Sequence, residues 1–317
     1  MMLTRRAMLG AALALPVAAR AEQFAGRYEP RAEPIADGLW MVRGADAPIE
    51  FGNGGAIANS ALIATEAGTV LFDPGVSLTH GQALAALALQ VTGIPVARVY
   101  VSHLHPDHAF GAAAFDPWIV HALPATRKEL ERDGEGLSDA MYDLLADWMK
   151  GTNLVLPLGD VAAGDATFGG RDFRMFALSG HSGGDLALLD RRTGTLIAGD
   201  LVFHDRAPST PHADLPSWRA ALDVLEATPH KLLLPGHGPL DTDHTAITQT
   251  RDWLDWIDAT LRKAVAGGLS MAEAGDIAIP GRFARLKAAR YEWQRSVSHF
   301  YPGLEEELLP RLQEIRP

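Results

Sequence analysis

Residues 103–108 read His-Leu-His-Pro-Asp-His, and this run constrains the chain more than any other segment. It directly follows residues 96–102, an apolar, β-branched stretch that predicts a buried strand. The polar side chains therefore leave the end of that strand on one tight loop. Imidazole and carboxylate groups without a thiolate suit zinc and similar divalent ions such as Mn, Fe or Co. The four candidate ligands on this loop are His103, His105, Asp107 and His108.

Three later segments each place a further candidate ligand beside glycine, near the end of a predicted strand. Glycine lets the backbone turn sharply and approach closely, as a ligand delivered from a strand end requires. Each signal is weak alone, because Gly-His and Gly-Asp turns are common. Together, and in order after residues 103–108, they are a strong signal for a metal-binding constellation. These three candidates are His181, Asp200 and His237.

The bulk composition narrows the classes of function. The chain has 317 residues and is 47% hydrophobic, so it can bury a sizeable core. It contains no cysteine, which excludes disulfides, thiolate nucleophiles and thiolate metal ligands. The formal net charge of −11 argues against nucleic acid and anionic membranes as partners, and we expect a small-molecule substrate.

The first 21 residues predict an export signal rather than part of the fold. A short basic segment holds Arg5 and Arg6, an apolar stretch covers residues 7–18, and residues 19–21 read Ala-Arg-Ala. The apolar stretch is too short to span a bilayer. The run from Thr4 to Leu9 resembles a twin-arginine signal, with a general secretory signal as the alternative. Either route predicts an exported, periplasmic protein that is cleaved after Ala21.

Strand-like and helix-like segments alternate through residues 35–242, after a tail at residues 22–34 that is rich in Pro and Glu. Such alternation predicts a layered α/β domain. The predicted strands are 39–43, 57–64, 69–72, 96–102, a short one near Val120, 173–178, 186–189, 195–198 and 231–234. The predicted helices are 78–91, 125–150 and 217–227.

Residues 243–317 predict a C-terminal helical extension packed on the main domain. Trp253, Trp256 and Ile257 begin a stripe at helical spacing, so we interpret the tryptophans as core anchors rather than a ligand cage. Basic residues gather between Arg282 and Arg295. We interpret them as a solvated helix face that pairs with the acidic body, with an anion or partner site as the alternative.

With these motifs in place, the chain resembles the metallo-β-lactamase superfamily of metallohydrolases over roughly residues 35–241. The resemblance implies an αββα four-layer sandwich. It also implies one metal on His103, His105 and His181, and a second on Asp107, His108 and His237, with Asp200 bridging both. Asp73, in the run Leu-Phe-Asp-Pro-Gly, matches an early aspartate that supports the ligand loop from behind the ligands.

Seven protein ligands, one of them shared, are too many for one tetrahedral zinc. Two zinc ions, with Mn or Fe as alternatives, would lie ~3.5–4 Å apart and share a bridging hydroxide as the nucleophile. The expected function is hydrolysis of a small ester, thioester or lactone-like substrate. The resemblance places Asp107 near the attacking water, where it would orient the water or accept its proton. We also consider His204, four residues after Asp200, a candidate substrate contact.

The branches of the superfamily differ at single ligands. Class B β-lactamases usually have Cys or Ser where this chain has Asp200, whereas a bridging carboxylate is similar to glyoxalase II and lactonases. Flavodiiron proteins carry Glu where this chain has His105. Persulfide dioxygenases keep nearly the same ligands around one iron, so β-lactam hydrolysis and iron-dependent oxygenation both stay open as alternatives.

A narrower resemblance rests on residues 53–59, residues 199–203 and the Ser217-Trp218 pair, which look like the quinoprotein relay system zinc metallohydrolases. It implies a functional association with quinoproteins. The alternative that does not involve an enzyme is a non-catalytic periplasmic accessory to quinoprotein systems. The loops at residues 45–55 and 206–215 are candidates for shaping the pocket.

Overall fold

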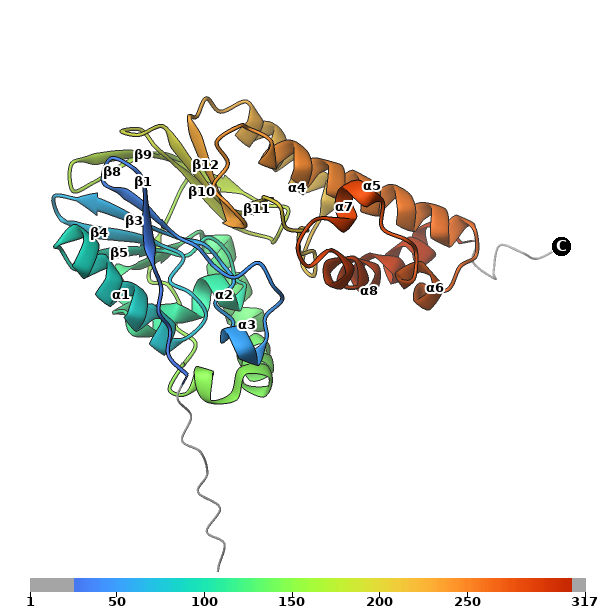
Figure 1. The fold of residues 1–317 in the computed structure, drawn as a ribbon, viewed down its shortest axis with the longest axis horizontal. Helices are drawn as coiled ribbons and strands as arrows, with labels where there is room; N and C mark the ends of the chain where they lie inside the picture. The colour runs from blue at the N-terminus through green and yellow to red at the C-terminus, as the bar shows by residue number, and fades with distance from the viewer. Residues whose placement is uncertain (1–25, 310–317) are drawn as a thin grey trace, which may run out of the picture.

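Two β-sheets lie face to face in the middle of the molecule, with helices on both outer sides (Figure 1). The computed structural model describes residues 26–309, so the predicted export signal and its cleavage site lie outside the described residues. Within 26–309, no helix combines the length and apolar character that a membrane crossing needs. The predicted αββα sandwich with a helical C-terminal extension is confirmed.

The first sheet holds seven strands in sequence order. Its pairs are antiparallel from β1 to β4 and parallel from β4 to β7. The strands are β1 (Ala32–Ala36), β2 (Leu39–Val42), β3 (Ser60–Thr65), β4 (Gly68–Phe72), β5 (Val96–Tyr100), β6 (Val120–Ala122) and β7 (Gly159–Asp160).

The second sheet has the order β12-β11-β10-β9-β8. Only its β11–β12 pair is parallel. The strands are β8 (Gly164–Phe168), β9 (Arg171–Leu178), β10 (Asp185–Asp190), β11 (Thr195–Phe203) and β12 (Leu232–His237).

The layers follow from the two-residue period of the strands, which sends alternate side chains to opposite faces. Val70 and Phe72 of β4 enter the core between the two sheets, whereas Leu71 points into the core beneath the first sheet. In β10, Leu186 joins the core between the sheets and Ala187 joins the core outside the second sheet. The central strands of both sheets are therefore buried on both faces.

Helices cover the outer face of each sheet (Figure 1). The first sheet is covered by α1 (Leu78–Thr92) and α3 (Pro124–Leu145), and the second by α4 (Leu215–Glu226) and α5 (Ala246–Ala266). Short helices complete the sandwich: η1 (Phe51–Asn53), α2 (Pro106–Ala109), η2 (Phe110–Ala114), η3 (Pro117–Ile119) and η4 (Ala146–Met149).

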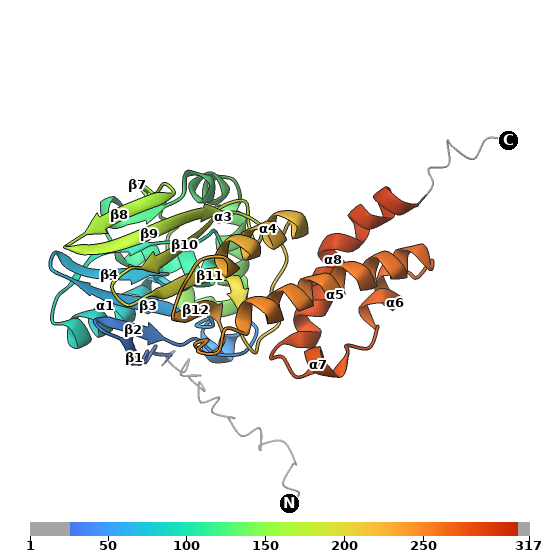
Figure 2. The ribbon, with the colours of Figure 1, turned by 90° about the horizontal axis from the view of Figure 1, so that it is seen from above.

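The C-terminal extension projects beyond one end of the sandwich (Figure 2). After α5 it consists of α6 (Met271–Gly275), α7 (Gly281–Ala284) and α8 (Ala289–Leu308), and α5, α6 and α7 each pack against α8. Trp253 and Trp293 are fully buried there, and Trp256 is partly buried against them. The interpretation of these tryptophans as core anchors is confirmed.

The element boundaries differ from the sequence prediction in three places. β1 starts at Ala32, inside the segment expected to be a tail, and β7 and β8 are too short or too polar to be recognised. β11 runs on to Phe203, so Asp200 lies within a strand rather than beyond its end. The register of β11 against β12 shifts at Gly199, where φ is +53°, and this irregularity turns Asp200 out of the regular pleat.

Candidate metal centre

The candidate ligands converge from four segments at one edge of the sandwich. His103 and His105 lie on the loop after β5, and Asp107 and His108 lie on α2. The other three come from the β9–β10 turn, from β11 and from the last residue of β12; they are His181, Asp200 and His237. All seven side chains are buried, and the most exposed, His105, belongs to a residue that is 9% exposed. We call these seven residues the metal floor.

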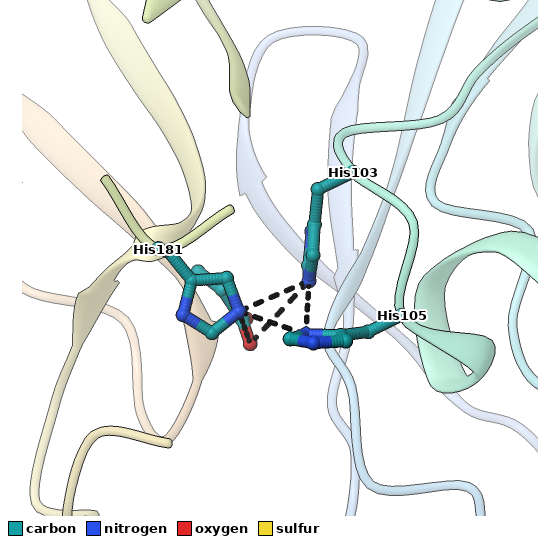
Figure 3. A group of neighbouring side chains, drawn as sticks. His103, His105 and His181 are labelled. Atoms are coloured by element: carbon teal, nitrogen blue, oxygen red, sulfur yellow. Dashed lines mark hydrogen bonds and ion pairs between the residues drawn. The ribbon is translucent and has the colours of Figure 1, made fainter. Parts of the chain in front are cut away.

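Three imidazole rings meet in the first cluster (Figure 3). His105 Nδ1 lies 2.9 Å from His103 Nε2 and 2.9 Å from His181 Nε2, and the two Nε2 atoms are 3.2 Å apart. Asp200 Oδ2 completes the group at 3.3 Å from His181 Nε2 and 3.8 Å from His103 Nε2. These separations are close to the ~3.3 Å edge of a tetrahedron with zinc–nitrogen bonds of ~2.0–2.1 Å.

The second cluster holds Asp107, His108 and His237. The Nε2 atoms of the two histidines are 3.3 Å apart, and Asp107 Oδ2 lies 3.6 Å from that of His108 and 3.4 Å from that of His237. Asp200 reaches this group with its other oxygen, Oδ1, at 3.1 Å from His108 Nε2 and 3.3 Å from His237 Nε2. One carboxylate therefore gives one oxygen to each cluster.

Hydrogen bonds at the far ring nitrogens indicate which nitrogen faces the cluster as a lone-pair donor. His108 Nδ1 lies 2.7 Å from Asp73 Oδ2, and His237 Nδ1 lies 2.9 Å from the carbonyl oxygen of Ile57. Both acceptors lack hydrogen, so each Nδ1 carries the proton and each Nε2 is left free for a cation. The donor sets of both clusters thus fit divalent metal ions.

Asp73 lies behind the ligand loop, as the resemblance implies. Its carboxylate accepts the backbone N–H of Ser102 at 2.7 Å and the Ser102 hydroxyl at 2.9 Å. The same hydroxyl oxygen lies 2.8 Å from Nδ1 of His103. The backbone of Asp73 has φ +60°, a conformation that Asp tolerates better than most residues. Asp73 therefore orients one histidine of each cluster, His108 directly and His103 through Ser102.

The glycine beside His237 is required by the close approach of β12 to Asp200. A Cβ atom on Gly236 would lie 1.9 Å from Asp200 Oδ1 and 2.7 Å from the carbonyl carbon of Gly199. Any side chain at position 236 would therefore displace the shared carboxylate. Asn59 fixes the same strand end, because its amide donates to the carbonyl oxygens of Pro235 and Gly238.

The charges in the floor also fit a cation. Burial alone would lower the pKa of His108, but the carboxylates of Asp200, Asp107 and Asp73 raise it well above its ordinary value. Burial and the neighbouring imidazoles, that of His108 first, hold the pKa of His103 well below its ordinary value. Three buried carboxylates around one imidazole need positive charge beside them, and neutral His103 keeps its lone pair available.

His181 and Asp200 each leave a buried atom without a hydrogen bond among the described residues. These atoms are His181 Nδ1 and Asp200 Oδ1, and the latter approaches two imidazoles without hydrogen-bond geometry. A buried carboxylate oxygen without a hydrogen bond is costly unless a cation binds it. The unpartnered oxygen of Asp200 therefore favours a metal on the side of the second cluster.

A small cavity of about 130 Å³ opens onto the floor at His105, Asp107, Asp200 and His237. We call the other residues that line it the pocket walls. They come from the loops at 45–57 and 206–212 and from the helices α2, α3 and α8: Ile49, Ile57, Pro106, Leu137, Met141, Leu144, Arg206, Ser209, His212, Tyr291 and Arg295. Both candidate pocket loops from the sequence thus reach the cavity. The C-terminal extension contributes α8, because the segment before α8 pairs with the 206–215 loop.

The structure places His204 away from this cavity. Its Nδ1 lies 3.0 Å from the carbonyl oxygen of Pro239 and its Nε2 lies 3.5 Å from the Thr245 hydroxyl, and it is not among the lining residues. His212 lies there instead, with Nδ1 2.8 Å from His105 Nε2. Sequence reasoning did not single out His212 or Ser102 as site residues. Arg206 begins one of the predicted pocket loops, and Arg295 belongs to the basic cluster for which an anion or partner site is the alternative interpretation.

Comparison with known proteins agrees with this architecture. A family model described as the metallo-β-lactamase superfamily matches residues 53–237. No curated protein matches the chain in sequence. Solved structures with the same fold include a metallo-β-lactamase from Pontibacter korlensis, at 19% identity and a TM-score of 0.52, covering 72% of this chain and 99% of that one.

Two further structures are similar to the same extent. The mono-zinc form of the metallo-β-lactamase FIM-1 from Pseudomonas aeruginosa has 15% identity and a TM-score of 0.58, covering 73% of this chain and 96% of that one. A metallo-β-lactamase from Erythrobacter litoralis has 18% identity and a TM-score of 0.57, covering 74% of this chain and 98% of that one. The fold, the histidine and aspartate clusters and the family match agree: this chain belongs to the metallo-β-lactamase superfamily.

Proposed function

We propose that this protein is a dinuclear zinc-dependent hydrolase that acts on a small ester, thioester or lactone-like substrate. The observation that carries the proposal is the position of Asp200, whose two oxygens lie 3.3 Å from His181 Nε2 and 3.1 Å from His108 Nε2. A carboxylate that gives one oxygen to each of two clusters of nitrogen donors favours two cations over one. The first would be held by His103, His105 and His181, and the second by Asp107, His108 and His237.

The chemistry that such a pair of ions supplies is Lewis acidity, which polarises a substrate carbonyl and brings the pKa of water to about 7. The side chains of the protein supply the rest. Asp107 belongs to the second cluster and also lines the cavity. There its carboxylate would orient the attacking water or accept its proton. Asp73 and Ser102 keep His108 and His103 in the required orientation.

The carboxylate at position 200 supports ester and thioester hydrolysis rather than β-lactam hydrolysis. Class B β-lactamases usually carry Cys or Ser at that position, and their ligand sets do not share one carboxylate between both ions. The names of the similar structures describe those proteins. At 15–19% identity, the similarity shows only that this chain has the same fold. Turnover of the chromogenic β-lactam nitrocefin, without turnover of esters, would reverse this preference.

The test is a substrate panel with the zinc-loaded protein and its His108→Ala variant. We expect the wild type to hydrolyse members of an ester, thioester and lactone panel, and the variant to lose most of that activity together with part of its zinc. Oxygen consumption with one bound iron, measured by elemental analysis, would overturn the proposal in favour of a persulfide dioxygenase. No turnover across the panel would favour a non-catalytic accessory.

We further propose that the protein is exported to the periplasm and is functionally associated with quinoproteins there. Support for export comes from the Arg5-Arg6 segment and the Ala-Arg-Ala run ending at Ala21. Support for the association comes from the resemblance of residues 53–59. N-terminal sequencing of the protein from a periplasmic extract tests the first point, with cleavage after Ala21 as the expected result.

A further inference from the structure

The cavity above the metal floor has two unlike sides. Helix α3 contributes an apolar side made of Leu137, Met141 and Leu144, and the residue Leu144 is 45% exposed. Another part of the cavity lining carries two arginines, Arg206 from the loop after β11 and Arg295 from α8. A ligand that fills the cavity therefore meets both hydrocarbon side chains and positive charge.

One carboxylate serves both guanidinium groups. Glu292 is fully buried, and its Oε1 lies 3.1 Å from Arg206 Nη2 while its Oε2 lies 3.3 Å from Arg295 Nη1. Among residues 26–309, the ion pairs of both arginines go only to Glu292. Two positive charges share one negative charge, so this side of the cavity keeps one positive charge in excess.

The two arginines differ in how free they are to bind a ligand. The Arg206 side chain is 2% exposed, and its Nε has no hydrogen-bond partner among the described residues. The Arg295 side chain is 40% exposed and donates to Ser209 Oγ at 3.0 Å. A buried guanidinium N–H without an acceptor is costly. Arg206 also donates to the carbonyl oxygens of Ala207 and Ala47, each at 3.3 Å, so the protein holds it in place, while Arg295 can turn toward a ligand.

Other acidic groups near the cavity do not neutralise this excess. Asp133 pairs with Arg132 at 2.6 Å. Asp107 and Asp200 face the imidazoles of the metal floor, where bound cations would take up their charge. Arg206 and Arg295, which share Glu292, are thus the charged residues of the pocket walls that a substrate would meet.

We propose that Arg295, backed by Arg206, forms a subsite for a carboxylate of the substrate, and that the substrate carries an apolar part as well. This inference rests on the proposed hydrolytic function and names its substrate class. A planar guanidinium matches a carboxylate in a bidentate arrangement. One excess positive charge balances a monoanion and leaves a doubly charged phosphate monoester undercompensated. The apolar part lies against Leu144 and its neighbours on α3.

The kinetic test compares two matched esters, mono(para-nitrophenyl) adipate and para-nitrophenyl hexanoate, which differ by a terminal carboxylate in place of a methyl group. We expect Arg295→Gln to lower kcat/KM for the adipate roughly 10- to 100-fold, mostly through KM, and to leave the hexanoate within about twofold. Arg295→Lys keeps the charge but loses the planar fork, so the adipate should fall less in it than in Arg295→Gln. The control is Arg282→Gln, which removes one charge at an exposed residue outside the cavity.

A binding measurement makes the test independent of turnover. Adipic acid monoanilide, titrated calorimetrically into the zinc-loaded protein, should bind more tightly than the neutral hexananilide, and Arg295→Gln should remove most of that difference. Thermal unfolding of each variant checks that it is folded.

The possible outcomes separate the two proposals. Equal losses for both esters in Arg295→Gln, or unchanged anilide binding, overturn the carboxylate subsite. If the wild type hydrolyses neither ester but still binds the monoanilide through Arg295, the subsite stands and the ester hydrolysis fails. If both esters are hydrolysed without preference, the hydrolase stands and the subsite fails.

Discussion

The metal floor and the pocket walls are built in different ways. Every residue of the floor is at most 9% exposed, and most of its imidazole rings have a second hydrogen bond on the side away from the clusters. In the walls, Leu144 and Tyr291 are 45% and 41% exposed, and the side chain of Arg295 is 40% exposed. The floor is thus fixed by its own packing, whereas parts of the walls are free to adjust to a ligand.

The difference separates two tasks. A fixed floor keeps imidazole and carboxylate donors a few ångströms apart, which stabilises bound cations and resists reorganisation during the reaction. Adjustable walls set which molecule reaches that floor. The floor holds the histidine and aspartate residues that the resemblance to the superfamily implies as ligands, whereas the walls are assembled from α3, α8 and the 206–215 loop.

The largest effect is expected from a change of Asp200, the residue that both clusters share. Asp200→Asn keeps the size of the side chain but removes the negative charge between the clusters. Loss of groups that only support metal ligands typically costs 10–100-fold, so loss of a direct, shared ligand should lower kcat/KM more than about a hundredfold. Steady-state kinetics on the hydrolysed ester measure this, and activity within tenfold of the wild type would contradict a shared role for Asp200.

Asp73→Asn tests a residue that orients two of the candidate ligands without being a ligand itself. Asn keeps the tolerance for the positive φ of this position but cannot accept the N–H of His108 and the two Ser102 hydrogen bonds as a carboxylate does. We expect metal affinity or kcat to fall about 10- to 100-fold with the fold intact. Competition with a chromogenic zinc chelator measures the affinity, and unchanged affinity together with unchanged kcat would remove Asp73 from the account.

His212→Gln probes the boundary between floor and wall, because His212 lines the cavity and touches His105 Nε2 at 2.8 Å. The residue is only partly buried, so water can replace its ring. The expected loss of kcat/KM is therefore at the low end for a supporting group, about tenfold. A loss as large as that of Asp200→Asn would instead give His212 a direct part in the reaction.

The smallest effect is expected from an uncharged residue of the pocket walls. Tyr291→Ala removes an exposed ring from the cavity without touching a floor residue. We expect KM to rise about threefold to tenfold, the value of burying part of an apolar ring, with kcat and zinc content unchanged. If zinc content fell with KM, the separation of floor from walls would not hold.

The floor could be predicted from sequence because its signals are local. Four of its residues fall within six positions after a strand-like run, and the other three lie beside glycine at strand ends. The carboxylate of Asp73 was predicted because an Asp-Pro-Gly turn after a strand has a recognisable place in the superfamily pattern. The hydrogen bonds that connect Asp73 to His103 through Ser102 could not be predicted, because a serine at a strand end occurs in many proteins for other reasons.

Both predicted pocket loops reach the cavity, but the contacts within the walls could not be predicted because their residues meet only through the tertiary fold. Arg206 and Glu292 are 86 residues apart, and no spacing in the sequence connects them. The basic cluster that includes Arg295 is interpreted from the sequence as a solvated helix face. That interpretation fits Arg282, which pairs with Asp252 on the surface, but Arg295 lines the cavity. Likewise, His204 is near Asp200 in sequence, yet its ring contacts Pro239 and Thr245, whereas distant His212 reaches His105.

Counting the metal ions bound per chain is the most direct test of the claim that two donor clusters share Asp200. Elemental analysis of zinc-saturated, dialysed protein should give about two equivalents for the wild type and about one for Asp200→Asn. A single equivalent in the wild type, or two retained in the variant, would contradict a dinuclear centre held together by this carboxylate.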